Sequence, residues 1–325
     1  MIEVKRILCA VDFSTHSRRA LDHATALARW YDATLTALYV YPPAPVPAVG
    51  PSLVAFDPPI LTELDREQLA RDLQAFVAAE SGAPVAVDSV VREGYPATTI
   101  AECALDTNAD LLVLGTHGRT GFERLLLGSV AERVLRHAPC PVLTVPTAHR
   151  APTPAASPVF KDIVCAIDFS AASIAALDYA LSLAREADAR LTILHVASST
   201  IEPSMFDLTA DAGLTVAELR QRLERDLEAQ LVATVPVGAS EYCRVETLMT
   251  QGRPGPEIVR VAADLRADLI VMGVFGRGAV DLTVFGSTAQ HVVRAASCPV
   301  LTIRRKSETV WKTAHARAGS TGRQS

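Results

Sequence analysis

The chain has 325 residues, of which 49% are hydrophobic and 21% are charged, a composition typical of a globular protein with material for about two domains. The formal net charge is −5, although residues 304–325 carry six Lys or Arg against one Glu, so the preceding residues carry about −10. An acidic body argues against broad nucleic-acid binding, and the apolar content argues against a disordered chain.

Targeting and redox features point to the cytoplasm. No apolar run approaches the length of a membrane-spanning helix, and the first residues pass straight into a strand pattern without the apolar core of a signal peptide. The six cysteines are too few for a disulfide scaffold, and none has the spacing of a zinc site. We expect a cytoplasmic protein with buried thiols, no membrane partner and no nucleic-acid partner.

The first half alternates strands with amphipathic helices. Strands are predicted at 6–14, 33–41, 85–92, 111–115 and 141–145. The first helix has an apolar face of Ala20, Ala24, Leu27, Ala28 and Tyr31. The second, at 62–80, has one of Leu64, Leu69, Leu73, Phe76 and Val77. Two more helices are predicted at 98–107 and 129–137. This βαβ order favours a parallel sheet covered by helices.

The second half repeats this order of strands and helices. The offset is 156 residues between Asp12 and Asp168 and 158 residues between Gly94 and Gly252. A period of this length indicates a duplicated domain rather than a solenoid. Each copy is therefore predicted to be an α/β domain with five strands and four helices.

Proline-rich and polar segments divide the chain. The predicted division is a first domain at 1–146, a linker at 147–158, a second domain at 159–305 and a disordered tail at 306–325. Within the first domain, residues 42–59 contain seven prolines without apolar periodicity, which predicts a loop or a lid over a site.

A glycine-punctuated loop follows the fourth strand of each copy. The two versions are LLVLGTHGRTGFERLLLGSV at 111–130 and LIVMGVFGRGAVDLTVFGST at 269–288, with identical glycine spacing. Glycine accepts positive φ and lets a ligand approach the backbone. Ser129 and Ser287 either cap the following helix or bind a phosphate together with its N-terminus. Two matched copies favour a ligand loop, with helix capping alone as the alternative.

An aspartate closes the first strand of each copy. In an open parallel sheet, ligands bind beyond the carboxyl ends of the strands where the strand order reverses. Asp12 and Asp168 could accept hydrogen bonds there from ribose hydroxyls or an exocyclic amine, or hold a divalent cation through water. The alternative is that they cap the next helix, a role for which Ser14 and Ser170 compete.

These features resemble the universal stress protein family over residues 3–146 and 159–304. The family signature of its ATP-binding members, G-x2-G-x9-G-[ST], is matched by Gly115, Gly118, Gly128 and Ser129 and by Gly273, Gly276, Gly286 and Ser287. The resemblance implies an open five-stranded parallel sheet flanked by four helices in each domain, a Rossmann-like fold of the adenine nucleotide alpha hydrolase type.

The resemblance also implies an ATP site in each copy, with Mg²⁺ as a companion of the nucleotide and no assigned metal ligand. Asp12 and Asp168 would meet the adenosine end. The backbone of Val40 and Val196 would contact adenine, beside Leu114 and Met272. The loop glycines and the Gly-Ser pairs would hold the ribose and phosphates, and Val130 and Thr288 would add backbone contacts.

Other nucleotide motifs are not met. Neither loop has the lysine of a P-loop, no GxGxxG follows a first strand, and no Ser-Gly-Gly loop of an ATP pyrophosphatase is present. No catalytic set recurs in both copies, since His117 of the first loop is replaced by Phe275. We expect binding with slow hydrolysis at most.

The two loops differ in charge, because the first carries Arg119, Glu123 and Arg124 and the second Arg277 and Asp281. We expect the first copy to bind ATP more tightly.

Each copy ends in a short apolar strand, at 141–145 and 299–303, where a sheet edge is expected. In the family the last strands of two subunits pair, so the resemblance implies an intramolecular pseudo-dimer here and allows further homo-oligomers. The sequence thus predicts an ATP-binding tandem universal stress protein with a regulatory or stress-survival role. A slow ATPase and a nucleotide-free interaction scaffold are the alternatives.

Overall fold

The structure is a computed structural model that describes residues 3–43, 63–78, 85–118, 127–146, 160–197, 215–275 and 285–304. Most of the proline-rich segment, the linker, the tail and the middle of both glycine loops lie outside the described residues. Predictions on those segments therefore stay predictions.

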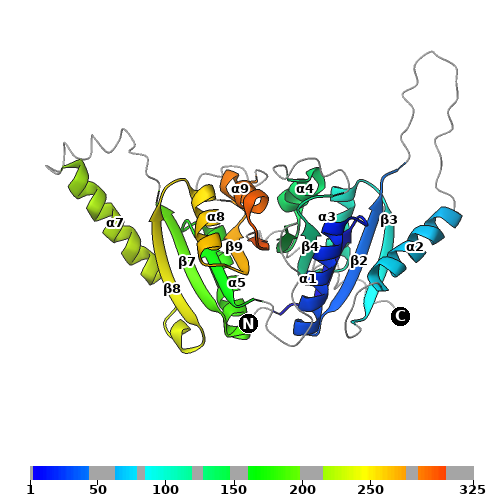
Figure 1. Ribbon diagram of the computed structural model, residues 1–325, viewed down its shortest axis with the longest axis horizontal. Helices are drawn as coiled ribbons and strands as arrows, with labels where there is room; N and C mark the ends of the chain where they lie inside the picture. Colours follow the sequence, from blue (N-terminus) through cyan, green and yellow to red (C-terminus); the bar gives the residue numbers. More distant parts are fainter. Residues whose placement is uncertain are drawn as a thin grey trace, which may run out of the picture.

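Both halves show the expected order of elements (Figure 1). The first half contains β1 (Arg6–Val11), α1 (Thr15–Tyr31), β2 (Thr34–Tyr41), α2 (Glu63–Ala78), β3 (Val87–Glu93), α3 (Pro96–Asp106), β4 (Leu111–Gly115), α4 (Ser129–His137) and β5 (Val142–Val145). The second half contains β6 (Asp162–Ala166), α5 (Ala171–Ala187), β7 (Arg190–Ala197), α7 (Val216–Ala233), the 3-10 turn η1 (Ala239–Glu241), β8 (Arg244–Gln251), α8 (Pro254–Asp264), β9 (Leu269–Gly273), α9 (Ser287–Ala295) and β10 (Val300–Ile303).

The ten strands form one sheet in the order β3-β2-β1-β4-β5-β10-β9-β6-β7-β8. Neighbouring strands are parallel within each half, which confirms the predicted five-stranded parallel sheets. β5 and β10 are antiparallel neighbours, with Thr144 opposite Val300 and Val142 opposite Thr302. The last strand of each half therefore lies at the edge of its own five strands, as predicted, and the two edges pair in the middle of the ten-stranded sheet.

Helices cover both faces of the sheet and enclose two apolar cores that run through both halves. Side chains of α1, α2, α5 and α7 contribute to one core, and side chains of α3, α4, α8 and α9 contribute to the other. The strands between the two layers are nearly continuous apolar runs, as parallel sheets buried on both faces require.

The apolar face predicted for the helix at 62–80 is wrong in one residue. Leu64 is 73% exposed and Leu73 is fully buried, because residues nine positions apart lie on opposite sides of a helix.

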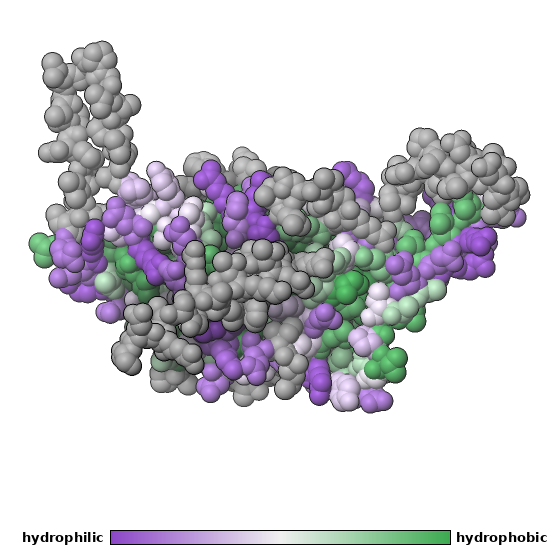
Figure 2. Space-filling model, turned by 180° about the vertical axis from the view of Figure 1, so that it is seen from behind, coloured by the Kyte–Doolittle hydropathy of each residue, from purple (hydrophilic) through white to green (hydrophobic). Residues whose placement is uncertain are grey.

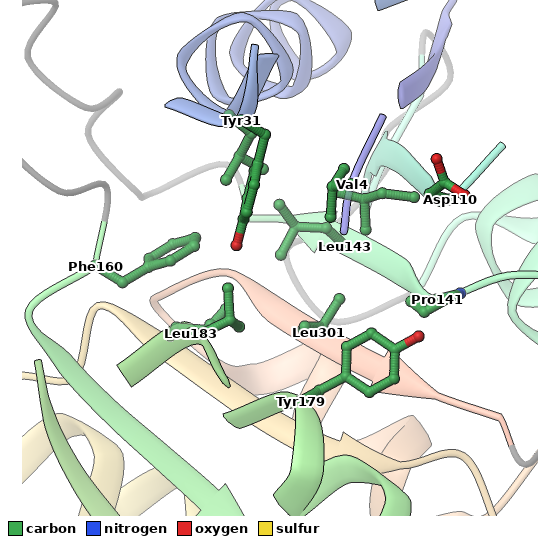
Figure 3. Close-up of a pocket in the computed structure, with 12 residues that line it drawn as sticks. Val4, Tyr31, Asp110, Pro141, Leu143, Phe160, Tyr179, Leu183 and Leu301 are labelled. Carbon is green, nitrogen blue, oxygen red and sulfur yellow. The ribbon is translucent and has the colours of Figure 1, made fainter. Parts of the chain in front are cut away.

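A small apolar cavity lies where the halves meet, between α1, α5 and the β5–β10 pair (Figure 3). Tyr31 and Leu143 of the first half and Phe160, Leu183 and Leu301 of the second point toward one another around it. Burial, together with the neighbouring carboxylate of Glu186, raises the pKa of Tyr31. The side chains that line this junction come from both halves, so it contributes to the packing between them.

The surface of the second half carries apolar side chains near α7. Leu223, Val232 and Val237 are exposed, and Figure 2 shows hydrophobic surface at this end of the molecule. Within the described ranges, no helix is both long enough and apolar enough to cross a membrane.

Candidate functional site

The candidate site of each half lies where the strand order reverses. β1 pairs with β2 on one side and with β4 on the other, and β6 is placed in the same way between β7 and β9. Asp12 directly follows β1, and Gly115 ends β4. This is the crevice in which open α/β sheets bind ligands.

A hydrogen-bonded turn orients the aspartate in the first half. The backbone N–H of Ser14 donates to Asp12 Oδ1 at 3.0 Å, and the N–H of Asp12 donates to Ser17 Oγ at 3.2 Å. Ser14 is the N-cap of α1, since its hydroxyl oxygen accepts from the N–H of Ser17. The alternative that Asp12 caps the helix is therefore wrong.

The second half reproduces this turn. The N–H of Ser170 donates to Asp168 Oδ1 at 3.0 Å, and the N–H of Asp168 donates to Ser173 Oγ at 3.3 Å. Ser170 caps α5, so the capping alternative is wrong for Asp168 as well. Each aspartate thus has one carboxylate oxygen held by the turn.

Sequence reasoning missed a backbone feature beside each aspartate. Phe13 has φ 64° and Phe169 has φ 62°, a left-handed conformation that bulky residues rarely adopt and that costs about 1–3 kcal/mol. Ring contacts hold both phenylalanines in place. The centroids of the Phe13 and Tyr39 rings lie 4.6 Å apart, and those of the Phe169 and His195 rings lie 4.7 Å apart. The available signal was the repetition of Asp-Phe-Ser-x-x-Ser at equivalent positions of the two copies.

The glycine loop meets the aspartate at Gly118. A Cβ on Gly118 would lie 2.8 Å from Asp12 Oδ2, closer than a real side chain comes. Residues more than a hundred positions apart are thus brought together, as the predicted site requires. The equivalent Gly276 lies outside the described residues.

The glycines that end β4 and β9 have a packing role. A Cβ on Gly115 would lie 3.2 Å from the backbone of His16, and one on Gly273 would lie 2.9 Å from that of Ala172. Among the described glycines, positive φ occurs at Gly94, Gly238 and Gly252 and not at those of the loops. The described loop glycines therefore do not adopt the positive φ that glycine allows, and the close approach of α1 to Gly115 and of α5 to Gly273 explains two of them.

The loop closes onto the start of α4. Gly128 is the N-cap, and its N–H donates to Thr116 O at 2.9 Å. Ser129 is the first helical residue and makes no capping hydrogen bond, so the alternative that it caps α4 is wrong. The first N–H groups of a helix have no partner within it and favour an anion.

The second half closes its loop in the same manner. Gly286 caps α9 and its N–H donates to Val274 O at 3.1 Å, while Ser287 makes no capping bond. Val130 and Thr288 follow the serines in the first turns of α4 and α9. Both helix starts therefore lie directly beside the ends of β4 and β9.

The residues expected near the base lie on the strands that flank β1 and β6. Val40 and Leu114 are next to last in β2 and β4, and both are buried in the core on the α3 and α4 side. Val196 and Met272 hold the same places in β7 and β9. Each pair therefore surrounds the carboxyl end of the strand that leads to the aspartate.

The first half also contains a pair of histidines. The rings of His16 and His117 lie 5.7 Å apart, and His117 Nδ1 lies 2.9 Å from Thr116 Oγ1. Burial lowers the pKa of His16, and so do His117 and Arg19, whereas Asp12 raises it. Burial and the charged neighbours together thus favour the neutral form of His16.

The charged side chains predicted to distinguish the two glycine loops lie outside the described residues. Arg119, Glu123, Arg124, Arg277 and Asp281 lie beyond the described residues, so the predicted charge difference between the loops stays a prediction. In the part of the chain that the structure describes, no three His, Cys, Asp or Glu side chains are grouped so as to hold a metal ion.

Comparison with known proteins gives matches in both halves of the chain. A family model described as the universal stress protein family matches residues 3–146 and 160–304. Universal stress protein MJ0531 of Methanocaldococcus jannaschii is 39% identical over 144 residues, which are 43% of this chain and 81% of that protein. Universal stress protein Mb2019 of Mycobacterium bovis is 27% identical over 316 residues, which are 92% of this chain and 94% of that protein.

Solved structures show the same fold. The crystal structure of a universal stress protein from Archaeoglobus fulgidus has a TM-score of 0.62 at 21% identity and covers 92% of this chain and 98% of that one. A protein of unknown function from Pseudomonas aeruginosa has a TM-score of 0.62 at 17% identity and covers 98% of each chain. The chain belongs to the universal stress protein family and carries the family's domain in tandem.

Proposed function

We propose that the protein binds ATP in each half and acts as a regulatory or stress-survival module through nucleotide-dependent contacts. The observation that carries the proposal is the meeting of Asp12 with Gly118 beside the start of α4, at the point where the strand order reverses. A ligand with a hydroxyl-bearing end and an anionic end suits a carboxylate next to a helix N-terminus.

Different residues of the first half would contact different parts of the nucleotide. Asp12 would accept hydrogen bonds from the ribose, the backbone of Val40 would contact adenine, and Leu114 would lie beside the base. The first N–H groups of α4, at Ser129 and Val130, would donate to the phosphates. Mg²⁺ would enter with the phosphates, and we assign no side chain to it.

The second half offers the equivalent groups. Asp168 would meet the ribose, Val196 the base, and the start of α9 at Ser287 and Thr288 the phosphates. The same turn around each aspartate and the same closure of each loop support two sites per chain.

We infer that the protein binds nucleotide with little or slow hydrolysis. Hydrolysis needs a general base held close to the attacking water. The candidate base of the first loop is His117, and Phe275 replaces it in the second half. A slow ATPase would be supported by multiple turnovers per minute that are lost with Asp12→Asn.

We also propose that the two halves form an intramolecular pseudo-dimer. The antiparallel pairing of β5 with β10 supports it, as do the apolar side chains from both halves at the junction. Sedimentation of the full chain would detect further homo-oligomers.

Isothermal titration of nucleotide-free protein with MgATP tests ATP binding. We expect two sites per chain, of which Gly128→Val removes the first and Gly286→Val the second, with circular dichroism to establish that each variant is folded. Absence of binding heat and of a rise in melting temperature with millimolar MgATP would contradict the proposal, because a ligand that binds only the folded state must raise that temperature.

A further inference from the structure

Three polar side chains gather beside the phosphate end of the first candidate site. His16 lies in the first turn of α1, and Thr116 and His117 lie directly after β4. The Nδ1 atom of His117 lies 2.9 Å from Thr116 Oγ1, and the His16 ring lies 5.7 Å from the His117 ring. The Nε2 atom of His117 is buried and has no hydrogen-bond partner among the described residues. A buried ring N–H without a partner is costly unless a ligand supplies an acceptor.

The second half replaces all three with apolar side chains. Ala172, Val274 and Phe275 occupy the equivalent positions, and Phe275 is buried. The guanidinium of Arg304 lies over the Phe275 ring, 5.1 Å from its centroid. The described residues that follow β9, Val274 and Phe275, therefore carry no side chain that titrates near neutrality, and the arginine beside them keeps its charge at all relevant pH values.

Building on the proposed function, we propose that His16 and His117 contact the phosphate chain of the nucleotide in the first half and that His16 takes up a proton when it binds. The first site is then tuned by pH through this histidine pair, which the second site lacks; the histidine of the second site, His195 on β7, instead faces the Phe169 ring and the carbonyl of Ile167. Four titratable or charged groups face one another at this point, namely His16 on α1, His117 on the loop, Asp12 at the end of β1 and Arg19 on α1.

The direction of the effect follows from charge. Without ligand, burial and His117 lower the pKa of His16, so the ring is neutral at neutral pH. A phosphate chain supplies negative charge that favours the protonated form, so its binding takes up protons. Affinity at the first site therefore rises as the pH falls toward the range where histidine titrates, and it declines as the pH rises through the bound-state pKa.

The test is titration of full-length protein with MgATP at about pH 6 and about pH 8. The Gly286→Val background reports the first site alone, and the Gly128→Val background reports the second. Protonation of the phosphates of ATP affects both sites alike, so the second site is an internal control. We expect the first site to bind at least about tenfold more tightly at the lower pH, relative to the second, since one pKa unit corresponds to a factor of ten.

Two variants assign the effect to the histidines. His117→Phe and His16→Ala each introduce the residue that the second half already carries, so neither is foreign to the fold. In each we expect the ratio of affinities at the two pH values to fall to that of the second site. An unchanged ratio in both variants, or equal ratios at the two sites of the unmodified chain, would overturn the inference while ATP binding itself remained. Loss of all binding heat in the unmodified chain would overturn the proposed function and this inference together.

Discussion

Thr144 and Thr302 join the two halves from equivalent positions, each using its hydroxyl to bond the strand of the other half. Thr144 Oγ1 donates to Val300 O at 3.2 Å and Thr302 Oγ1 donates to Val142 O at 3.1 Å, and both side chains are fully buried. The bonds add to the backbone ladder between β5 and β10 and fix its register, because a shift of one residue would turn both hydroxyls to the other face.

Removing these hydroxyls should destabilise the fold moderately. Thr144→Val and Thr302→Val keep the branched shape and each lose one buried hydrogen bond, so we expect about 1 kcal/mol less free energy of unfolding per substitution. Urea denaturation measures the loss. Thr247→Val on β8, where the side chain is exposed, is the matched control and should change stability little. Equal effects at Thr247 and Thr144 would show that the hydroxyls at the join contribute nothing specific.

The contact of Gly118 with Asp12 should control binding at the first site. In Gly118→Ala the new methyl group would lie 2.8 Å from Asp12 Oδ2, so the carboxylate or the loop must move. We expect the affinity for MgATP at the first site to fall by about tenfold or more, with the second site unchanged, as calorimetry would show. Unaltered affinity at the first site would mean that this carboxylate oxygen does not face the ligand.

The left-handed backbone at Phe13 predicts an inverted preference between alanine and glycine. The left-handed conformation costs alanine about 1–2 kcal/mol and costs glycine almost nothing. The free energy of unfolding should therefore be about 1 kcal/mol higher for Phe13→Gly than for Phe13→Ala. Both variants lose the ring contact with Tyr39, which therefore cancels in the comparison. At exposed Glu67 in α2 the order should reverse, because glycine weakens a helix. Greater stability of the alanine variant at residue 13 would refute the strained turn.

Buried thiols should make the fold sensitive to alkali. Burial raises the pKa of Cys298 from 9.0 to about 12. Because the pKa of this thiol is higher in the folded than in the unfolded chain, the contribution of the buried thiol to the free energy of unfolding is complete below pH 9.0. That contribution is lost as the pH rises toward 12. Urea denaturation between about pH 8 and about pH 10.5 should show falling stability, and the difference between the unmodified chain and Cys298→Ala should narrow over that range. A constant difference would show that this thiol does not contribute to the alkaline loss.

Local patterns were sufficient to predict the elements and which segments meet at the candidate site. Apolar periodicity predicted the strands and most helix faces, because burial on a strand or helix depends on near neighbours in sequence. The repeated glycine spacing and the aspartate after the first strand predicted which loops meet, because parallel strands place their carboxyl ends at one edge.

The tertiary structure decided what each of these residues does. Whether Ser129 caps α4 depends on which residue begins the helix, and Gly128 takes the capping position. The need for glycine at residue 115 comes from the backbone of His16 on another element. The histidine pair likewise joins residues that are far apart in sequence. The sequence by itself therefore determined the repeated α/β architecture and the candidate loops, whereas contacts between distant segments decided the packing and which side chains lie together at each candidate site.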